Sequence, residues 1–489
     1  MSSLNSEPRR KPKLAQIVAA QILDEIIRRG WPTGKSLGTE KELIERHAVS
    51  RATIREAVRQ IERQGAANMR RGYAGGLIVS EPPRSTTVRA LATYFDLADI
   101  TFEEQSALRL NLEIMAARYA AERLNDEGIR RLRTMVDELE RITDFVAGVQ
   151  QHFAIRTAIA ESTGNPALPL FIQALDSVIL KIFEVAHRDK GFLERDRLRS
   201  LKHKRDLVGA IVAHDGARAE MLVRQDVKFR ETRIRGDLKR VTGAGGRQHD
   251  ALNFWNSLKL GDMIARRIVE DIRKDGGKEG RNIGPEPLLQ ARFGVSRETL
   301  REGIRLLELH GLVETRSGLQ GGLLVGRANP HHTVETVKIY LRCMNMRMSH
   351  LWEVQSALEI NAAEVLASRI TSSDILEFDD ALAELMNANS RNALAVSAKI
   401  HMLIAEKTCN RALSLFVRIL LEFGVETLPA LEPARLKWLQ KITAALVAAL
   451  KTKDAGLARR RMIELFTGGA KWIGTVGDAP DFLPKELQF

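Results

Sequence analysis

The sequence contains an internal repeat with an offset of 246 residues. At that offset the segment 40–65 lies over the segment 286–311 without a gap, and 18 of the 40 positions between 40 and 79 are identical. Chance would give about two or three identities at ordinary composition. The register continues with a slight drift, so that Asn165 falls on Asn410. We interpret the repeat as the duplication of a whole two-domain unit of about 240 residues.

The first part of each copy has the pattern of three helices followed by a hairpin. In copy one, apolar spacing predicts a first helix over 14–30, and the capping-box pattern that begins at Thr39 predicts a second helix over 39–47. A third helix is expected over 50–65, where a serine can cap its start and a glycine ends it. The glycine-containing turn and the β-prone run that follow, within 69–79, predict a short hairpin, or wing.

The start of this third helix carries arginine and hydroxyl side chains. Arg51, Thr53 and Arg55 lie near a helix N-terminus, where free backbone N–H groups and the helix dipole favour phosphate. Arginine can also bind the O6/N7 edge of guanine bidentately. The motif S-R-x-T-x-R occurs twice, each time before a G-x-x-G-G segment, which favours a DNA-reading helix over a merely solvated helix face. A nucleotide-binding loop is excluded, because no strand precedes a G-x-G-x-x-G or G-K-[ST] pattern.

The remaining sequence reads as successive amphipathic helices, so the predicted fold class is mainly α. Segments without apolar periodicity separate its parts, and the segment 241–250 is rich in glycine, as linkers are. The sequence predicts winged helix-turn-helix domains, α-helical with a small β-hairpin wing, each followed by an all-α helical-bundle effector domain. The expected boundaries are 10–80 and 257–326 for the winged domains, 85–236 and 331–476 for the helical domains, and 237–256 for the linker.

The pattern E-x-x-L-x-x-R-x-x-V-S-R-x-T-[IL]-R-E, at 40–56 and 286–302, resembles the GntR family of bacterial regulators. Members are usually homodimers that bind near-palindromic DNA operators and are tuned by a small metabolite. Pro287 replaces the usual basic residue in copy two, so one phosphate contact is expected to be lost there. The resemblance implies that the DNA-contacting residues are Lys41, Ser50, Arg51, Thr53, Arg55, Arg70, Arg71 and Gly72 in copy one, and Ser296, Arg297, Thr299, Arg301, Arg316 and Gly318 in copy two.

The larger domains resemble the FCD effector domain of the FadR subfamily. Many FCD domains hold a divalent metal with one Asp and three His, and the metal anchors the carboxylate of an organic-acid effector. The corresponding positions here are His152, Arg156, Lys204 and Asp226 in copy one, and Ser397, His401, Thr443 and Leu465 in copy two. Arginine and lysine place fixed positive charge where a cation would sit. The sequence therefore predicts no metal and no cofactor.

Two interpretations of the first effector pocket stay open. Arg109, Arg156 and Lys204 could bind a carboxylate or phosphate directly, or the pocket is relict and these side chains reach the surface. In copy two Gln355 replaces Arg109, and His401 is expected to be structural or to meet a weakly polar ligand. The expected effector-pocket residues are Arg109, His152, Arg156, Lys204, Asp226, Gln355 and His401.

The composition and net charge of the chain limit the classes of function that it can have. The net charge of +13 suits a polyanionic partner, and two cysteines cannot form a disulfide framework or a thiolate zinc site. No apolar run has membrane-spanning length, so a cytoplasmic protein without a membrane partner is expected. An enzyme is the rival class, but the sequence has no Ser/His/Asp arrangement, metal cage or phosphate loop.

The expected function is that of a DNA-binding transcriptional regulator controlled by a small organic acid, repression being the commoner habit of the family. Because one chain holds both copies, it could act as a covalent pseudo-dimer on double-stranded operator DNA. Alternatively the chain also homodimerises and presents four DNA-binding domains. A regulator or scaffold with degenerate effector pockets, which no longer senses a ligand, is the second interpretation of function.

Overall fold

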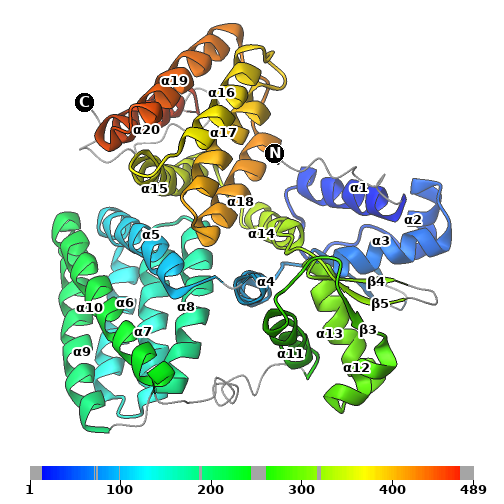
Figure 1. The fold of residues 1–489 in the computed structure, drawn as a ribbon, viewed down its shortest axis with the longest axis horizontal. Helices are drawn as coiled ribbons and strands as arrows, with labels where there is room; N and C mark the ends of the chain where they lie inside the picture. The colour runs from blue at the N-terminus through cyan, green and yellow to red at the C-terminus, as the bar shows by residue number, and fades with distance from the viewer. Residues whose placement is uncertain are drawn as a thin grey trace. The chain divides into compact units, whose positions relative to one another are not determined.

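The structure, a computed structural model, describes residues 14–473 apart from 71, 73–74, 99, 187–189, 244–259 and 317–320 (Figure 1). Arg71, Gly318 and most of the linker expected at 237–256 lie outside the described residues. Twenty helices and five short strands occur in the described part, which confirms the mainly α fold class. The chain divides into two compact units, Met1–Thr87 with Glu335–Met346, and Val88–Val334 with Arg347–Phe489.

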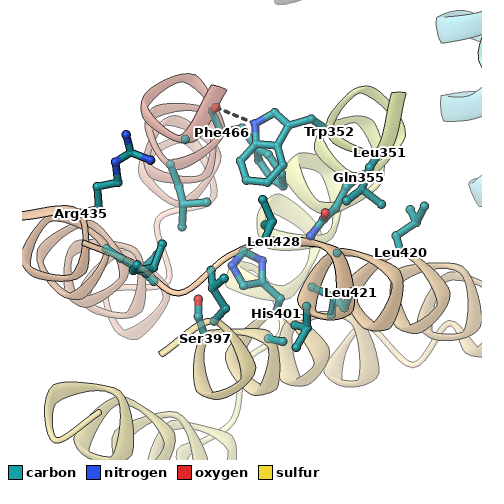
Figure 2. Close-up of a pocket in the computed structure, with 18 of the residues that line it drawn as sticks. Leu351, Trp352, Gln355, Ser397, His401, Leu420, Leu421, Leu428, Arg435 and Phe466 are labelled. Atoms are coloured by element: carbon teal, nitrogen blue, oxygen red, sulfur yellow. Dashed lines mark hydrogen bonds between the residues drawn. The ribbon is translucent and has the colours of Figure 1, made fainter. Parts of the chain in front are cut away.

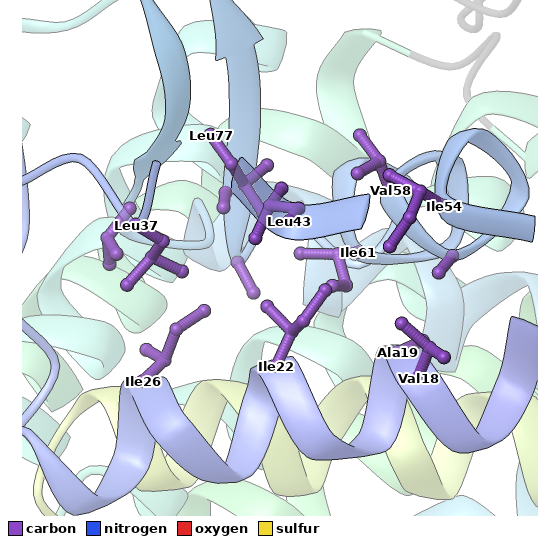
Figure 3. Packing of buried hydrophobic residues seen from close by; sticks show 14 of the residues in the cluster. Val18, Ala19, Ile22, Ile26, Leu37, Leu43, Ile54, Val58, Ile61 and Leu77 are labelled. Carbon is purple, nitrogen blue, oxygen red and sulfur yellow. The ribbon is translucent and has the colours of Figure 1, made fainter. Parts of the chain in front are cut away.

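The first unit contains a winged helix-turn-helix domain. Its elements are α1 (Leu14–Arg28), α2 (Glu40–His47), α3 (Arg51–Arg63), β1 (Ala67–Arg70) and β2 (Gly76–Val79). Figure 3 shows Ile22 and Ile26 of α1 facing the interior of this domain. Leu43 of α2 and Ile54 and Ile61 of α3 complete the same core. The apolar stripe of each helix is therefore buried, which leaves the polar face of α3 for solvent or a partner.

Side-chain caps fix where the two central helices begin. Thr39 and Glu42 form the capping box expected at the start of α2. Ser50 caps α3, and its Oγ accepts a hydrogen bond of 3.2 Å from the backbone N–H of Thr53. Between the two helices Ala48 adopts the left-handed conformation. These local contacts set the turn that places the N-terminus of α3 at the surface.

The wing depends on a close approach of two backbones. β1 and β2 pair as an antiparallel hairpin. A Cβ at Gly76 would lie 2.7 Å from the carbonyl oxygen of Gly38, so no larger residue fits without a shift of the backbone. The second copy repeats this arrangement, because a Cβ at Gly322 would lie 3.0 Å from the carbonyl oxygen of Gly284.

The first winged domain packs against a helix from the other copy. Residues 335–346, most of α14 (His331–Cys343), belong to the first unit. Ile339 is part of the domain's buried core, and the hydroxyl oxygen of Tyr340 accepts a hydrogen bond of 3.0 Å from Arg84 Nε. The helix that leads into the second effector domain is thus built into the first DNA-binding domain.

The second unit contains the second winged domain. Its elements are α11 (Leu260–Lys274), β3 (Asn282–Gly284), α12 (Glu286–Phe293), α13 (Arg297–Leu309), β4 (Val313–Arg316) and β5 (Gly322–Val325). The strands form one antiparallel sheet in the order β3-β5-β4. Pro285 stands at the cap of α12 without a side-chain hydrogen bond, so the capping box of α2 is lost. Ser296 caps α13 as Ser50 caps α3.

The second winged domain in turn packs against a helix from copy one. Leu97, at the end of α4 (Arg84–Leu97), is buried in the core of this domain. The Asp96 carboxylate lies 2.8 Å from Arg266 Nε, and its backbone carbonyl accepts a hydrogen bond of 2.8 Å from Arg273. Each winged domain therefore holds the connecting helix of the opposite copy, an exchange that the repeat by itself did not predict.

Each copy continues into an all-helical domain within the second unit (Figure 1). The first consists of α5 (Phe102–Arg123), α6 (Asp126–Arg141), α7 (Phe145–Glu161), α8 (Ala167–Ala186), α9 (Lys190–Val212) and α10 (Gly216–Gly243). The second consists of α15 (Met348–Ala367), α16 (Ser372–Met386), α17 (Ala393–Lys407), α18 (Arg411–Thr427), α19 (Pro433–Lys451) and α20 (Ala455–Ile473). In the described ranges no helix combines the length and the apolar character needed to cross a membrane.

The two helical domains meet through contacts that repeat with exchanged roles. The side-chain amide of Asn165 donates a hydrogen bond of 2.8 Å to the carbonyl of His350, and that of Asn410 donates one of 2.8 Å to the carbonyl of Glu104. These are equivalent pairs, because Asn165 corresponds to Asn410 and Glu104 to His350 in the repeat. The reciprocity is what a two-fold arrangement of two subunits produces.

An aromatic stack lies at the same junction. The rings of Phe171 and Phe416 are stacked, with centroids 3.9 Å apart and planes 10° from parallel. Both side chains are fully buried. Arg411 adds an ion pair of 2.7 Å to the carboxylate of Glu104. The junction therefore combines an apolar centre with polar contacts around it, as stable subunit interfaces do.

Candidate nucleic-acid interface and effector cavities

The tip of α3 exposes two arginines that share one carboxylate. Arg51 Nε lies 2.7 Å and Arg55 Nε 2.9 Å from Glu40 Oε1. The two side chains remain 68% and 53% exposed. In the described structure neither guanidinium has another hydrogen-bond partner, so the terminal nitrogens stay available. Their hydrogen bonds and charge, opposed by slight burial, lower the pKa of Glu40.

The second copy repeats this arrangement on α13. Arg301 Nε lies 3.0 Å and Arg297 Nε 3.7 Å from Glu286 Oε2. These side chains are 44% and 66% exposed. In both copies the carboxylate binds the inner Nε and leaves the outer edge of each guanidinium, which is the edge that grips phosphate or guanine. The glutamate of each copy thus orients the two arginines and leaves their terminal nitrogens available to bind a partner.

The other expected DNA contacts fall into two groups. Ser50 and Thr53 are engaged with each other through the helix cap, with their hydroxyl oxygens 2.9 Å apart, and Ser296 and Thr299 repeat this contact. The remaining residues are exposed side chains or wing positions: Lys41, Arg70, Gly72 and Arg316. The serine and threonine side chains therefore stabilise the start of the helix. The exposed side chains and wing positions are accessible to DNA.

The first helical domain buries a cluster of ionic side chains. Its basic members are Arg109, Arg156, Lys204 and Arg230, and its acidic members are Glu113, Asp176 and Asp226. Arg109 and Arg156 both contact Asp176 Oδ1, at 2.5 Å and 2.7 Å. Arg230 contacts Glu113 Oε2 at 2.5 Å. With four cations and three carboxylates, the cluster carries one excess positive charge when all its members are ionised.

A cavity of about 90 Å³ opens beside this cluster. Its lining includes the expected residues His152, Arg156, Lys204 and Asp226. Arg109 does not line this cavity and instead contacts Asp176. The interpretation that the long basic side chains reach the surface is wrong, because Arg109, Arg156 and Lys204 are all buried.

The electrostatics of this cavity favour an anion. Burial, with Lys204 and Arg156 nearby, lowers the pKa of His152 to about 3, so this imidazole is neutral. Burial also lowers the pKa of Lys204 to about 8, although Asp226 opposes the shift. Lys204 Nζ lies 3.9 Å from Asp226 Oδ2, and no described residue accepts a hydrogen bond from it. A buried ammonium group without an acceptor is costly, and a bound carboxylate or phosphate would remove that cost.

The residues present do not fit the divalent metal of many FCD domains. Arg156 and Lys204 occupy two of the ligand positions with cationic groups that cannot donate an electron pair while charged. Within the described ranges no three His, Cys, Asp or Glu side chains come together as a possible metal site.

The second helical domain holds a cavity of a different character. It has a volume of about 110 Å³ and is lined mostly by apolar side chains. Figure 2 shows Gln355 from α15 and His401 from α17 close together in its lining. Behind them Glu359 is fully buried, where it accepts a hydrogen bond of 2.8 Å from Gln355 Nε2 and a short one from His401 Nδ1.

Sequence reasoning found part of each site and missed the rest. It did not identify Glu113, Asp176 and Arg230 as members of the first cluster, nor Glu359 as the partner of His401. The i,i+4 spacing of Arg109 with Glu113 and of Asp226 with Arg230 was a usable signal for ion pairs on one helix face. Asp176 offered no such pattern, because its partners come from other helices.

Comparisons with known proteins agree with this architecture. The family model for bacterial regulatory proteins of the gntR family matches residues 14–75 and 260–321, and the FCD domain model matches residues 104–229 and 350–468. The HTH-type transcriptional repressor NanR of Cronobacter sakazakii is 29% identical over 184 residues, which cover 36% of this chain and 69% of the relative. NanR of Enterobacter sp. is 28% identical over 225 residues, covering 45% and 84%.

A solved structure of a Streptococcus agalactiae GntR protein covers 44% of this chain and 97% of its own, with 22% identity and a TM-score of 0.32. Winged helix-turn-helix domains that expose arginines at the tips of α3 and α13, each joined to a helical domain, define a DNA-binding transcriptional regulator. The relatives are regulators and not enzymes. The chain belongs to the GntR family, in its FadR/FCD-like group, and carries the family's two-domain unit twice.

Proposed function

We propose that this regulator is a repressor that works as a covalent pseudo-dimer and responds to a small organic acid. The observation that carries the pseudo-dimer is the reciprocal pair of contacts from Asn165 to His350 and from Asn410 to Glu104. Repression is proposed because relatives such as NanR bear the name of transcriptional repressor.

The exchange of connecting helices supports the same proposal. Ile339 enters the core of the first winged domain and Leu97 that of the second, so neither domain is complete without the other copy. In separate subunits such an exchange would require two chains to associate. Here both copies belong to one chain, so their association is intramolecular. Each copy therefore meets the other at a high effective concentration, whatever the concentration of the protein.

The two reading helices differ, so we propose an operator with unequal half-sites. Ala52 at the tip of α3 corresponds to Glu298 on α13, and Lys41 corresponds to Pro287. A glutamate can accept a hydrogen bond from cytosine N4, whereas alanine offers only an apolar contact. The alternative arrangement, in which two chains associate and present four DNA-binding domains, differs in the number of chains bound to each operator.

The effector is proposed to bind in the cavity of the first helical domain. Support comes from Lys204 Nζ and Arg156 Nε, which are buried there without hydrogen-bond acceptors in the described structure. A carboxylate could accept hydrogen bonds from both, and Arg156 is already held between Asp176 and the ring of Phe153. The cations would thus do directly what a metal does in other FCD domains.

An effector titration tests this function. We expect carboxylic and sugar acids to include at least one compound that changes the affinity of the chain for DNA from the upstream region of its own gene, measured by gel mobility shift. The Arg156→Met, Lys204→Met variant should bind that DNA normally and respond to the acid with an affinity weaker by about tenfold or more, since charge-assisted hydrogen bonds contribute about 1.5–3 kcal/mol.

A matched substitution provides the control. Lys202→Met removes a lysine from the same helix, α9, but its ammonium group is exposed and pairs with Asp206. This variant should respond like the wild type. An unchanged response in the Arg156→Met, Lys204→Met variant would contradict the proposed site, and a chain that responds to no acid would favour degenerate effector pockets.

A further inference from the structure

The cavity in the second helical domain differs from the first in its charge. His401 is the basic side chain that pairs with the buried Glu359, in place of the three guanidinium groups that surround Glu113 in the first domain. Arg435 also lines the cavity, but Figure 2 shows it apart from His401, and it lies 3.6 Å from Glu432. Among the described residues, therefore, no surplus of positive charge surrounds the buried carboxylate of the second cavity.

Three polar atoms at this cavity have no hydrogen-bond partner in the described structure. They are His401 Nε2, Ser397 Oγ and Gln355 Oε1, and none of them is fully buried. The hydrogen bond from Nδ1 to Glu359 fixes the orientation of the His401 ring, so Nε2 is the free edge. These atoms offer both donors and acceptors to one small polar group.

Apart from Arg435, most of the remaining lining is apolar and partly aromatic. Trp352, Trp438 and Phe466 contribute rings, and leucines from all the helices of the domain except α16 contribute further apolar side chains. The indole N–H of Trp352 donates a hydrogen bond of 2.9 Å to the carbonyl of Phe466, so this donor is already paired (Figure 2). An apolar chamber with a few convergent polar groups is the usual form of a small-molecule site.

We propose that this cavity binds an uncharged, compact aromatic or alicyclic molecule that carries a single hydroxyl or carbonyl group. The hydroxyl or carbonyl would bond to His401 Nε2 and its neighbours, and the ring would pack against the tryptophans. A carboxylate bound at His401 is disfavoured, because it would lie near Glu359 with His401 as the one shared cation, and two close carboxylates repel each other in an apolar surrounding. The chain would then sense two ligand classes, one in each copy.

This inference rests on the proposed function only for its regulatory consequence, so binding is tested first and without DNA. Isothermal titration calorimetry with the full chain at neutral pH compares the affinity for phenol with the affinity for benzoate. The two compounds have the same ring and differ in charge. We expect phenol to bind and benzoate to bind this cavity at least about tenfold more weakly. His401→Asn keeps a donor near the Nδ1 position and removes Nε2, and should weaken phenol binding by about tenfold.

Two further variants make the result decisive. Ala398→Phe places a large side chain in the lining of the cavity and should abolish phenol binding. This variant tests the site independently of His401→Asn, whose effect could also come from a perturbed fold. Arg156→Met, in the first domain, should leave phenol binding unchanged. The proposal is overturned if benzoate binds as tightly as phenol and is lost in Ala398→Phe, or if phenol fails to bind or binds Ala398→Phe unchanged. Phenol binding without any effect on DNA affinity would contradict the regulatory role alone.

Discussion

Replacement of both Arg51 and Arg297 by alanine is expected to abolish specific operator binding while the chain stays folded. Both side chains are more than half exposed, so their loss removes no core packing. Each bidentate contact of arginine with guanine discriminates by about 1–3 kcal/mol, so the double variant should lose about 30-fold to 10⁴-fold in affinity for its operator over non-specific DNA. Fluorescence anisotropy with operator and scrambled duplexes measures both affinities.

A second double variant separates base reading from overall charge. Arg59 and Arg305 occupy equivalent positions further along α3 and α13 and are also exposed. Their replacement by alanine changes the net charge by the same two units, so the loss through counterion release should be similar. We expect this control to retain preference for the operator. Equal loss of specificity in both double variants would mean that the tips of these helices do not read the bases.

The second large effect is expected from Glu113→Gln, which should destabilise the first helical domain. Burial by itself would raise the pKa of Glu113, but Arg230, Arg156 and Arg109 together hold it well below its usual range. Its contribution to stability is therefore present above the pKa of an unfolded glutamate and is lost only as the pH falls through the lowered value. At neutral pH the substitution leaves buried guanidinium groups short of a carboxylate, at a cost of about 3–5 kcal/mol.

The equivalent substitution in the second copy, Glu359→Gln, is the matched control. Burial disfavours the charged form of His401, but the charge of Glu359 and its hydrogen bond outweigh this effect and raise the pKa of His401. When Glu359 is neutralised, His401 can release its proton, whereas guanidinium groups stay charged. We therefore expect a smaller loss, of about 1–3 kcal/mol.

Hydrogen exchange followed by mass spectrometry distinguishes these effects within the full chain. In Glu113→Gln, exchange protection of α5 peptides should fall by about 150-fold to 4,000-fold, and in Glu359→Gln protection of α15 peptides should fall by about 5-fold to 150-fold. Equal losses in the two variants would contradict the different charge balance of the two clusters.

Local sequence patterns predicted the winged domains well. The capping residues Thr39 and Ser50, and the glycines of the wing, act through contacts within a few residues or across one hairpin. Such contacts leave a pattern in the sequence, and the second copy repeats the serine cap and the wing glycines, although Pro285 replaces the Thr39 cap. For this reason the sequence is sufficient to predict the three helices and the hairpin of each winged domain.

Long-range pairing could not be predicted in the same way. Ile339 and Leu97 are apolar residues on amphipathic helices, and nothing in their spacing indicates that each enters the core of the opposite copy. Asp176 joins the buried cluster through arginines on two other helices, α5 and α7. The reciprocal contact of Asn410 with Glu104 joins residues 306 positions apart, and the repeat does not specify which residues of the two copies meet.

Native mass spectrometry of the chain bound to its operator tests the central claim most directly, because it counts chains per duplex. If the duplicated unit acts as a covalent pseudo-dimer, the dominant complex contains one chain and one duplex, with both winged domains on the same operator. A dominant complex of two chains on one operator, with no one-chain complex at limiting protein, would contradict the account.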